Sequence, residues 1–173
     1  QTTNEKSAAT RETLRNYVLF LANTGVRHGT EALGLCWRNI EWYERDGERY
    51  LAVNVDGKTN KRTAIARDSV ENSLWRQAKL NPRIQAADFD ALIAAKLDKP
   101  VFTTRLSETV TVHNLNRAFN ALLAELNLKT GADGRTRTLY SFRHFYATLN
   151  LERGVTTHAL SRQLGNSTEM IDR

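Results

Sequence analysis

The sequence predicts an α+β fold that is mostly helical, with one small three-stranded antiparallel sheet. Apolar residues recur at helical spacing through most of the chain, but residues 40–66 change to the alternation that is typical of strands. Two turn dipeptides, Asp46-Gly47 and Asp56-Gly57, divide that stretch into three parts. A short run of strands inside a helical chain indicates an α+β domain.

A long helix is expected at the amino-terminal end. Leu14, Val18 and Leu21 fall on one helical face, and Gly25 suits the position just past a helix end. A second, short helix is expected over residues 30–37.

The three strands are expected near residues 40–44, 49–55 and 61–66. In the middle strand, Leu51 and Val53 alternate with smaller or polar neighbours, which predicts one face packed on a core.

Helices are expected again after the strands. Asp68 and Glu71 have the spacing of a capping box. Ser141 is placed to cap another helix, whose first turn carries Arg143 and which follows a polar loop at 127–137. The expected helices lie near residues 68–80, 86–96, 111–126, 141–153, 157–164 and from 167 onward.

Composition limits the class of protein. The chain is 40% hydrophobic and 25% charged, and a length of 173 residues fits a single domain over 1–173. No apolar run approaches the roughly 18 residues that span a membrane, and the polar start is no signal peptide. Because the first residue is Gln1 and not Met, we expect a fragment of a longer chain.

Cysteine content and charge indicate a setting and a partner. A lone thiol, Cys36, cannot form an intramolecular disulfide, so simple burial and a reducing, cytoplasmic setting are expected. The net charge of +6 makes an anionic partner plausible without saying anything about the fold.

Basic residues occupy three constrained places in the predicted fold. Arg27 lies between two helices, Lys58, Lys61 and Arg62 lie on a hairpin, and Arg143 lies in the first turn of a helix. Each place alone is more typical of solvated surface than of a site. Together, and in this order, they are far more specific.

The stretches around these residues resemble the catalytic domain of the tyrosine recombinases, the phage-integrase family. "TGVRHGTEALGLCWRNIEW" resembles the family's first arginine box, and "GKTNKR" stands where the family keeps its hairpin lysine. "YSFRHFYATLNLERG" is similar to the second box, His-x-x-Arg, and "LSRQLGNS" to the third. The resemblance runs from about residue 12 to the last residue.

The resemblance implies a reaction and roles for the matching residues. These enzymes cut a DNA phosphodiester with a tyrosine hydroxyl, store it as a 3′-phosphotyrosine and rejoin it, without metal or cofactor. Arg27 and Arg143 would clamp the phosphate, since arginine stays ionised and grips two oxygens. Lys58 would protonate the departing 5′-oxygen as general acid. Glu31 would orient Arg27, although a solvated carboxylate at a helix start is an equal alternative.

Two positions depart from the family pattern. Tyr140 stands in place of the His of His-x-x-Arg, and a phenol can donate to a phosphate but is a poor base near neutral pH. Asn166 stands where His or Trp is usual, and its amide can donate to a phosphoryl oxygen. A structural alternative for Asn166 is a cap, because its spacing to Glu169 is that of a capping box. We expect both Tyr140 and Asn166 to contact the phosphate and the enzyme to be active.

The remaining candidates have supporting roles. His144 is expected to support Arg143 without touching substrate. The other histidines show no metal-ligand spacing. The residues expected to contact DNA are Lys61, Arg62, Arg135 and Arg137. The tryptophans expected in the core are Trp37, Trp42 and Trp75.

The family spacing places the nucleophilic tyrosine near position 175, beyond Arg173. The resemblance also implies a longer protein, with amino-terminal DNA-binding domains and the nucleophile outside these residues. Its partner would be double-stranded DNA at attachment or recombination sites. A homo-tetramer is expected on DNA and a monomer for the isolated domain, with a role in integrating a bacterial or phage-encoded mobile element.

Two other classes of protein stay open at this point. The segment 149–173 resembles a helix-turn-helix with Gly154 at the turn, so a DNA-binding regulator or an inactive relative would also explain the charge. A phosphoryl enzyme of another kind is the remaining alternative. Neither explains why Arg27, the hairpin lysine and Arg143 arrive in family order.

Overall fold

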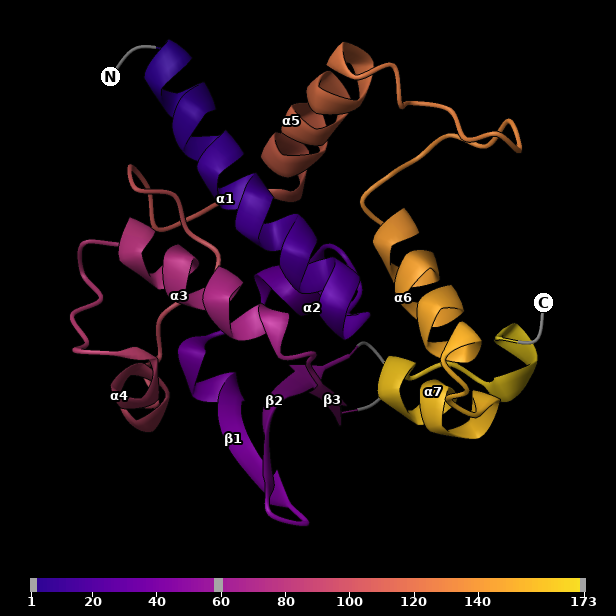
Figure 1. Ribbon diagram of the computed structural model, residues 1–173. Coiled ribbons are helices and arrows are strands. Elements are labelled where there is room, and N and C mark those ends of the chain that lie inside the picture. Colours follow the sequence, from indigo (N-terminus) through magenta and orange to yellow (C-terminus); the bar gives the residue numbers. More distant parts are fainter. Residues whose placement is uncertain (1–2, 58–60, 172–173) are drawn as a thin grey trace.

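The computed structural model describes residues 3–57 and 61–171 and contains the expected antiparallel sheet (Figure 1). Its strands are β1 (Ile40–Arg45), β2 (Glu48–Asp56) and β3 (Lys61–Ile65), in the order β1-β2-β3. The β1–β2 turn is made by Asp46 and Gly47, both with positive φ (54° and 79°), as a tight two-residue hairpin requires.

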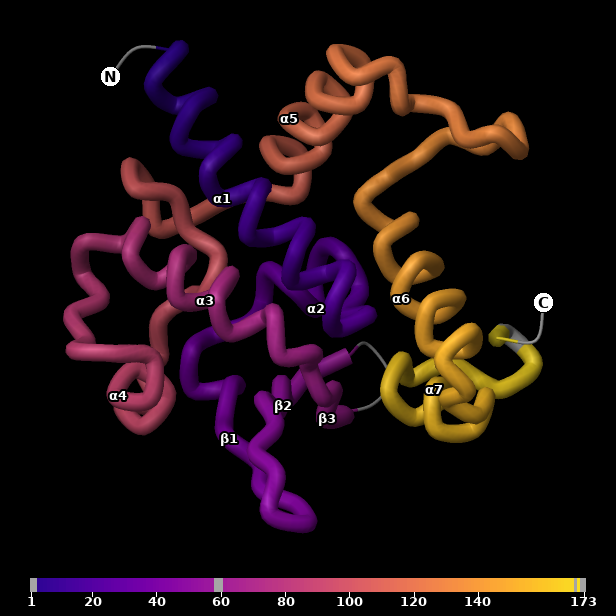
Figure 2. The backbone as a smooth tube through the Cα atoms, viewed as in Figure 1, coloured from indigo at the N-terminus to yellow at the C-terminus, as the bar shows by residue number. Residues whose placement is uncertain are grey.

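Helices supply most of the regular structure. Figure 2 shows how the backbone passes from one to the next. The elements are α1 (Thr3–Thr24), α2 (Thr30–Leu33), the 3₁₀ helix η1 (Trp37–Asn39), α3 (Ser69–Leu80), α4 (Phe89–Ala94), α5 (Val112–Glu125), α6 (Ser141–Glu152), α7 (Thr157–Leu164) and the 3₁₀ helix η2 (Thr168–Met170).

Helix α1 is the centre of the fold. It runs through the middle of the molecule and packs against α3, α5 and α6 (Figure 1). Its residues Tyr17, Phe20 and Leu21 are fully or almost fully buried, and Tyr17 and Phe20 pack edge-on against Phe102. Because large apolar side chains dominate core energetics, this packing positions α1 and the loop after it, which carries Arg27.

Helix α7 is attached to the sheet by a side chain that takes the place of a strand. The side-chain amide of Gln163 donates to the carbonyl of Ile65 at 2.7 Å, and its oxygen accepts from the amide of the same residue at 3.0 Å. A separate apolar cluster of Tyr146, Leu160 and Leu164 joins α7 to α6. The edge of β3 is therefore covered at Ile65.

Three sequence-based expectations about helix starts and length are wrong. The Asp68 side chain makes no cap hydrogen bond, because its backbone is already helical (φ −52°, ψ −35°). The Ser141 hydroxyl accepts from the amide of Thr138 in the preceding loop instead of capping α6. The helix expected over 86–96 is only Phe89–Ala94, because Asp88 caps it at Ala91.

Three further expectations need adjustment. The short helix expected over 30–37 is α2 alone, because Cys36 is extended and starts the separate turn η1. Of the three tryptophans, Trp37 is fully buried, whereas Trp42 and Trp75 pack on the core margin. Trp42 keeps its indole N–H outward to donate to Asp90 at 2.7 Å.

Within the described part of the chain, no helix combines the length and apolar character needed to cross a membrane.

Candidate active site

Arg143 is a buried cation held by the ends of two helices. It lies in the first turn of α6 with 3% of its surface exposed. Its guanidinium donates to the carbonyls of Gly25, just after α1, and Leu164, the last residue of α7. Carbonyls at helix C-terminal ends carry partial negative charge, so they suit a cation.

Arg27 approaches the same place from the loop between α1 and α2. Its side chain donates to Glu31 at 2.7 Å, and its backbone amide donates to the other carboxylate oxygen of Glu31 at 2.9 Å. A second terminal nitrogen donates to the carbonyl of Gly165 at 3.1 Å. Glu31 itself is buried in the first turn of α2, which excludes the alternative of a solvated carboxylate.

Asn166 joins the two arginines. Its side-chain oxygen accepts from Arg27 and from Arg143, each at 2.9 Å. The expectation that the two guanidinium groups converge is therefore confirmed. Because the oxygen faces the arginines, the amide nitrogen of Asn166 points away from them. The capping role considered for Asn166 is wrong, since Ser167 occupies the N-cap of η2.

Two glycines make this convergence possible. Gly25 and Gly165 both have φ of +67°, a left-handed conformation that side chains rarely adopt. A Cβ on Gly25 would lie 2.5 Å from Leu164 and 2.6 Å from Tyr146. The C-terminal ends of α1 and α7 can therefore approach this closely only because Gly25 has no side chain.

Charge at the site is strongly perturbed by burial and by neighbouring arginines. Burial would raise the pKa of Glu31, but hydrogen bonds from Arg62 and Arg27 outweigh it and lower this pKa to about 2. Burial, followed by the nearby charges of Arg27 and Arg62, lowers the pKa of Arg143 to about 10. Both groups therefore stay ionised at neutral pH.

A cavity of about 920 Å³ opens next to this cluster. Arg143 and Asn166 line it, together with Tyr140, His144 and the loop 131–138. The Arg143 Nε is buried and has no hydrogen-bond partner among the described residues. The cluster beside the cavity contains three arginines, Arg27, Arg62 and Arg143, and one carboxylate, Glu31, so its net positive charge favours an anion.

No protein-family model matches the chain. Among curated proteins, it is 25% identical over 181 residues to a "Tyrosine recombinase XerC-like" protein of Caldanaerobacter subterraneus subsp. tengcongensis. The alignment covers 94% of this chain and 44% of the relative, so the chain spans less than half of that protein.

Solved structures agree on the architecture. XerH site-specific recombinase bound to difH substrate aligns with a TM-score of 0.62 and 18% identity, over 95% of this chain and 43% of XerH. XerA recombinase aligns with a TM-score of 0.60 and 18% identity, over 99% and 56% of the two chains. The Tn1549 transposon integrase with circular intermediate DNA gives 0.61 and 15%, over 99% and 59%.

The fold is that of a tyrosine recombinase catalytic domain. These likenesses confirm the fold expected from the sequence, a mostly helical α+β domain with a three-stranded antiparallel sheet.

The other residues expected at a recombinase site lie in different surroundings. Lys58 lies outside the described residues, so its role as general acid stays a prediction. Tyr140 is 41% exposed and lines the cavity. His144 packs edge-on against the Tyr140 ring at 5.2 Å; none of its described contacts is with Arg143, which it was expected to support.

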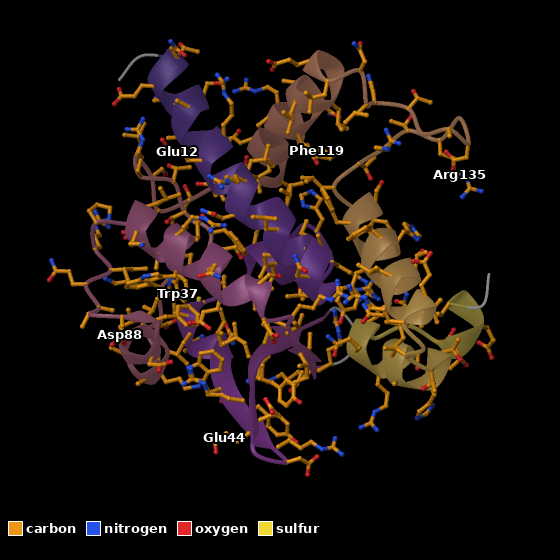
Figure 3. All side chains as sticks on the ribbon, in the orientation of Figure 1. Glu12, Trp37, Glu44, Asp88, Phe119 and Arg135 are labelled. Carbon is orange, nitrogen blue, oxygen red and sulfur yellow. The ribbon has the colours of Figure 1, made fainter. Side chains whose placement is uncertain are left out.

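The residues expected to contact DNA divide into two groups. Arg135 stands far out on the loop between α5 and α6 (Figure 3), and Lys61 is exposed on β3. Arg137 instead donates to the carbonyls of Leu128 and Thr130, so it braces the same loop. Arg62 is turned inward and bound to Glu31.

Sequence reasoning missed the inward role of Arg62 and the part played by Gln163. Strand alternation gave a usable signal for Arg62, because it is separated by one residue from the buried Ala64 and so shares its face of β3. No signal pointed to Gln163, whose role depends on how α7 docks on the sheet.

Among the described residues, no group of three or more His, Cys, Asp or Glu side chains could hold a metal ion.

Proposed function

We propose that this chain is the catalytic domain of a site-specific tyrosine recombinase and binds a DNA phosphodiester in the cavity beside Arg143. One observation carries the proposal. Arg27 and Arg143 share a single acceptor, Asn166, at the wall of an open cavity, and their only carboxylate neighbour in the described part of the chain, Glu31, is also bound to Arg62. A buried guanidinium group (Arg143) and a partly exposed one (Arg27) held this close repel each other, so an anion between them is favourable.

The geometry supports a different role for each residue around that phosphate. Arg143 and Arg27 would stabilise the charge that grows on the non-bridging oxygens. The Asn166 amide nitrogen, which faces away from the arginines, and the Tyr140 hydroxyl are the further donors proposed here. Both keep a donor where the family usually has an imidazole or indole.

The proposed reaction is a transesterification. A tyrosine oxygen attacks phosphorus, the bond to the 5′-oxygen breaks, and that oxygen takes a proton from Lys58 while the tyrosine proton passes to solvent. The attacking tyrosine is proposed near position 175 of the natural chain. The 3′-phosphotyrosine then reacts with another 5′-hydroxyl, so no bond energy is lost to water.

The partners follow from the relatives. XerH and the Tn1549 integrase are described in complexes with DNA, and we propose double-stranded DNA as the substrate here. A homo-tetramer on recombination sites, a cytoplasmic location and integration of a mobile element belong to the same proposal. A helix-turn-helix regulator is less favoured, because α7 supplies the Leu164 carbonyl to Arg143 and is attached to β3 through Gln163.

A nicked suicide DNA substrate tests the proposal. The chain extended by its natural continuation should form a covalent adduct with DNA, and mass spectrometry should place it on a tyrosine within about two positions of 175. The 173-residue chain should form none, because its five tyrosines all precede the third box. An adduct on the 173-residue chain, or an extended chain without adduct, would overturn the mechanism.

A further inference from the structure

We propose that Arg62 is a positioning residue of the phosphate site: it holds Glu31 so that Glu31 orients Arg27 without cancelling the positive charge offered to phosphate. This inference rests on the proposed function. It assigns Arg62 a role different from the direct DNA contact expected from its place beside the hairpin.

Each of the three guanidinium nitrogens of Arg62 donates a hydrogen bond inside the protein. Its two terminal nitrogens donate to the two carboxylate oxygens of Glu31 at 3.0 and 2.7 Å. Its Nε donates to the backbone carbonyl of Gln163 at 3.2 Å. The Arg62 side chain is 9% exposed, whereas that of Arg27 is 33% exposed. Arg27 is thus open to a ligand and Arg62 is withdrawn from it.

Arg62 also supports the turn that presents Asn166. A Cβ added to Gly165 would lie 2.9 Å from the Cδ of Arg62 and 3.2 Å from its Nε, so the arginine fills the space under this glycine. The carbonyl of Gly165 and the side chain of Asn166 are the two acceptors that hold Arg27 from the α7 side. Arg62 therefore contacts both Glu31 and Gly165, two of the residues that bind Arg27.

The charge balance gives this arrangement a consequence for binding. Glu31 alone would neutralise Arg27, because their contact is a close ion pair in a poorly solvated place. With Arg62 on the same carboxylate, three arginines face one negative charge, and an excess of two positive charges is left. A phosphodiester carries one negative charge and gains more as the transition state forms, so this excess is complementary to it.

A double-mutant cycle separates positioning from direct contact. The variants are Arg62→Gln, Glu31→Gln and the double variant, and the readout is the affinity of the 173-residue chain for a fluorescein-labelled duplex DNA at fixed salt. Arg62→Gln should weaken binding about tenfold, since Glu31 would then pair with Arg27 alone and neutralise more of its charge. In the Glu31→Gln background the same change should cost less than about twofold, because no carboxylate remains to be compensated.

Arg49→Gln is the matched control. Arg49 also donates to both oxygens of a carboxylate, Asp90, but on the exposed far end of the sheet, and its loss should leave DNA affinity unchanged. An equal loss for Arg62→Gln in both backgrounds would mean that Arg62 touches phosphate itself and would overturn the inference. No loss in the wild-type background would overturn it as well.

The pKa of the Glu31 carboxyl is a second readout, and a merely structural role of Arg62 would not change it. Arg27, Arg62 and Arg143 are the charged groups around it, all cationic. By ¹³C NMR, the Glu31 pKa should rise in Arg62→Gln and stay near the wild-type value in Arg62→Lys, which keeps the charge. Arg62→Lys should also bind DNA within about threefold of wild type. Equal Glu31 pKa values in the two variants would contradict the proposal.

Two outcomes distinguish this inference from the proposed function. A wild-type chain that binds no DNA at low salt would refute the proposed function and this inference with it. A wild-type chain that binds, loses affinity in Arg143→Ala and keeps it in Arg62→Gln would refute the inference alone. If Arg62→Gln is unfolded at the assay temperature, Arg62→Lys decides: binding weakened tenfold or more despite a folded chain would exclude the charge-based role.

Discussion

Arg62 and Arg143 are both withdrawn from solvent, but their surroundings differ. Arg62 donates to a carboxylate and a carbonyl, so the protein itself satisfies its charge. Arg143 donates to two carbonyls and an amide oxygen, and its Nε has no partner within the described residues. Arg62 therefore has its counter-charge within the protein, whereas Arg143 is a buried cation with no directly bound carboxylate, which is costly unless an anion binds nearby.

The largest effect expected from this comparison is on catalysis. In the extended chain, Arg143→Ala should slow formation of the covalent adduct by roughly 100-fold or more, because one donor to a developing charge is worth a few kcal/mol. Single-turnover trapping on the nicked substrate measures this. The surface variant Arg49→Ala is the control. A slowing of less than about fivefold for Arg143→Ala would contradict the proposal that Arg143 binds the phosphate.

The next effect is on stability and concerns Gly165, which packs against Arg62 and whose carbonyl accepts a hydrogen bond from Arg27. Gly165→Ala should lower the free energy of unfolding by about 1–3 kcal/mol, because a side chain at positive φ is strained and would meet Arg62. Urea denaturation measures it. Gly134→Ala is the control for backbone strain alone: it shares the positive φ of 76°, but nothing lies within 4 Å of an added Cβ.

Acid should lower the free energy of unfolding by protonating Glu31, the carboxylate that Arg62 binds. The folded pKa of Glu31 is depressed from 4.5 to about 2, so its stabilising contribution is complete above pH 4.5 and is lost as pH falls towards 2. The loss corresponds to about 3 kcal/mol for a shift of this size. Unfolding free energies measured across this window should fall in the wild type and show a flatter profile in Glu31→Gln. Parallel profiles would contradict the buried ion pair.

The smallest effect is expected at the cavity rim. Tyr140→Phe in the extended chain should slow adduct formation about three- to tenfold, since a partly exposed hydroxyl gives one hydrogen bond to the phosphate. Tyr140→His should recover at least the wild-type rate. If Tyr140→Phe reacts at the wild-type rate, Tyr140 only packs against His144.

The sequence predicted those parts of the site that depend on local order. The end of α1 at Gly25, the position of Glu31 one turn after Arg27, and the three-stranded sheet that follows α2 can all be predicted from spacing and turn residues. The convergence of Arg27 and Arg143 was expected only through family resemblance, because their partners are carbonyls at helix ends that no spacing rule relates.

Strand alternation places Arg62 on the same face of β3 as the buried Ala64, but it could not show which residues this arginine meets. A hairpin arginine is exposed or buried according to what docks on its strand, and that depends here on α7 reaching the edge of β3. The Ser141 capping error has a similar cause: the hydroxyl had two backbone amides within reach, and the loop rather than the helix took it.

The contacts of Arg143 and Arg27 also determine when the site forms during folding. Arg143 reaches a carbonyl 118 residues away in sequence, and Arg27 reaches Asn166 across 139 residues. Closing chain loops of this length costs more entropy than forming the local helices and hairpins, so these contacts are expected among the last to form. A chain that is still folding would therefore lack the proposed phosphate site. Only molecules in which α6 and α7 have docked against the end of α1 would bind DNA through it.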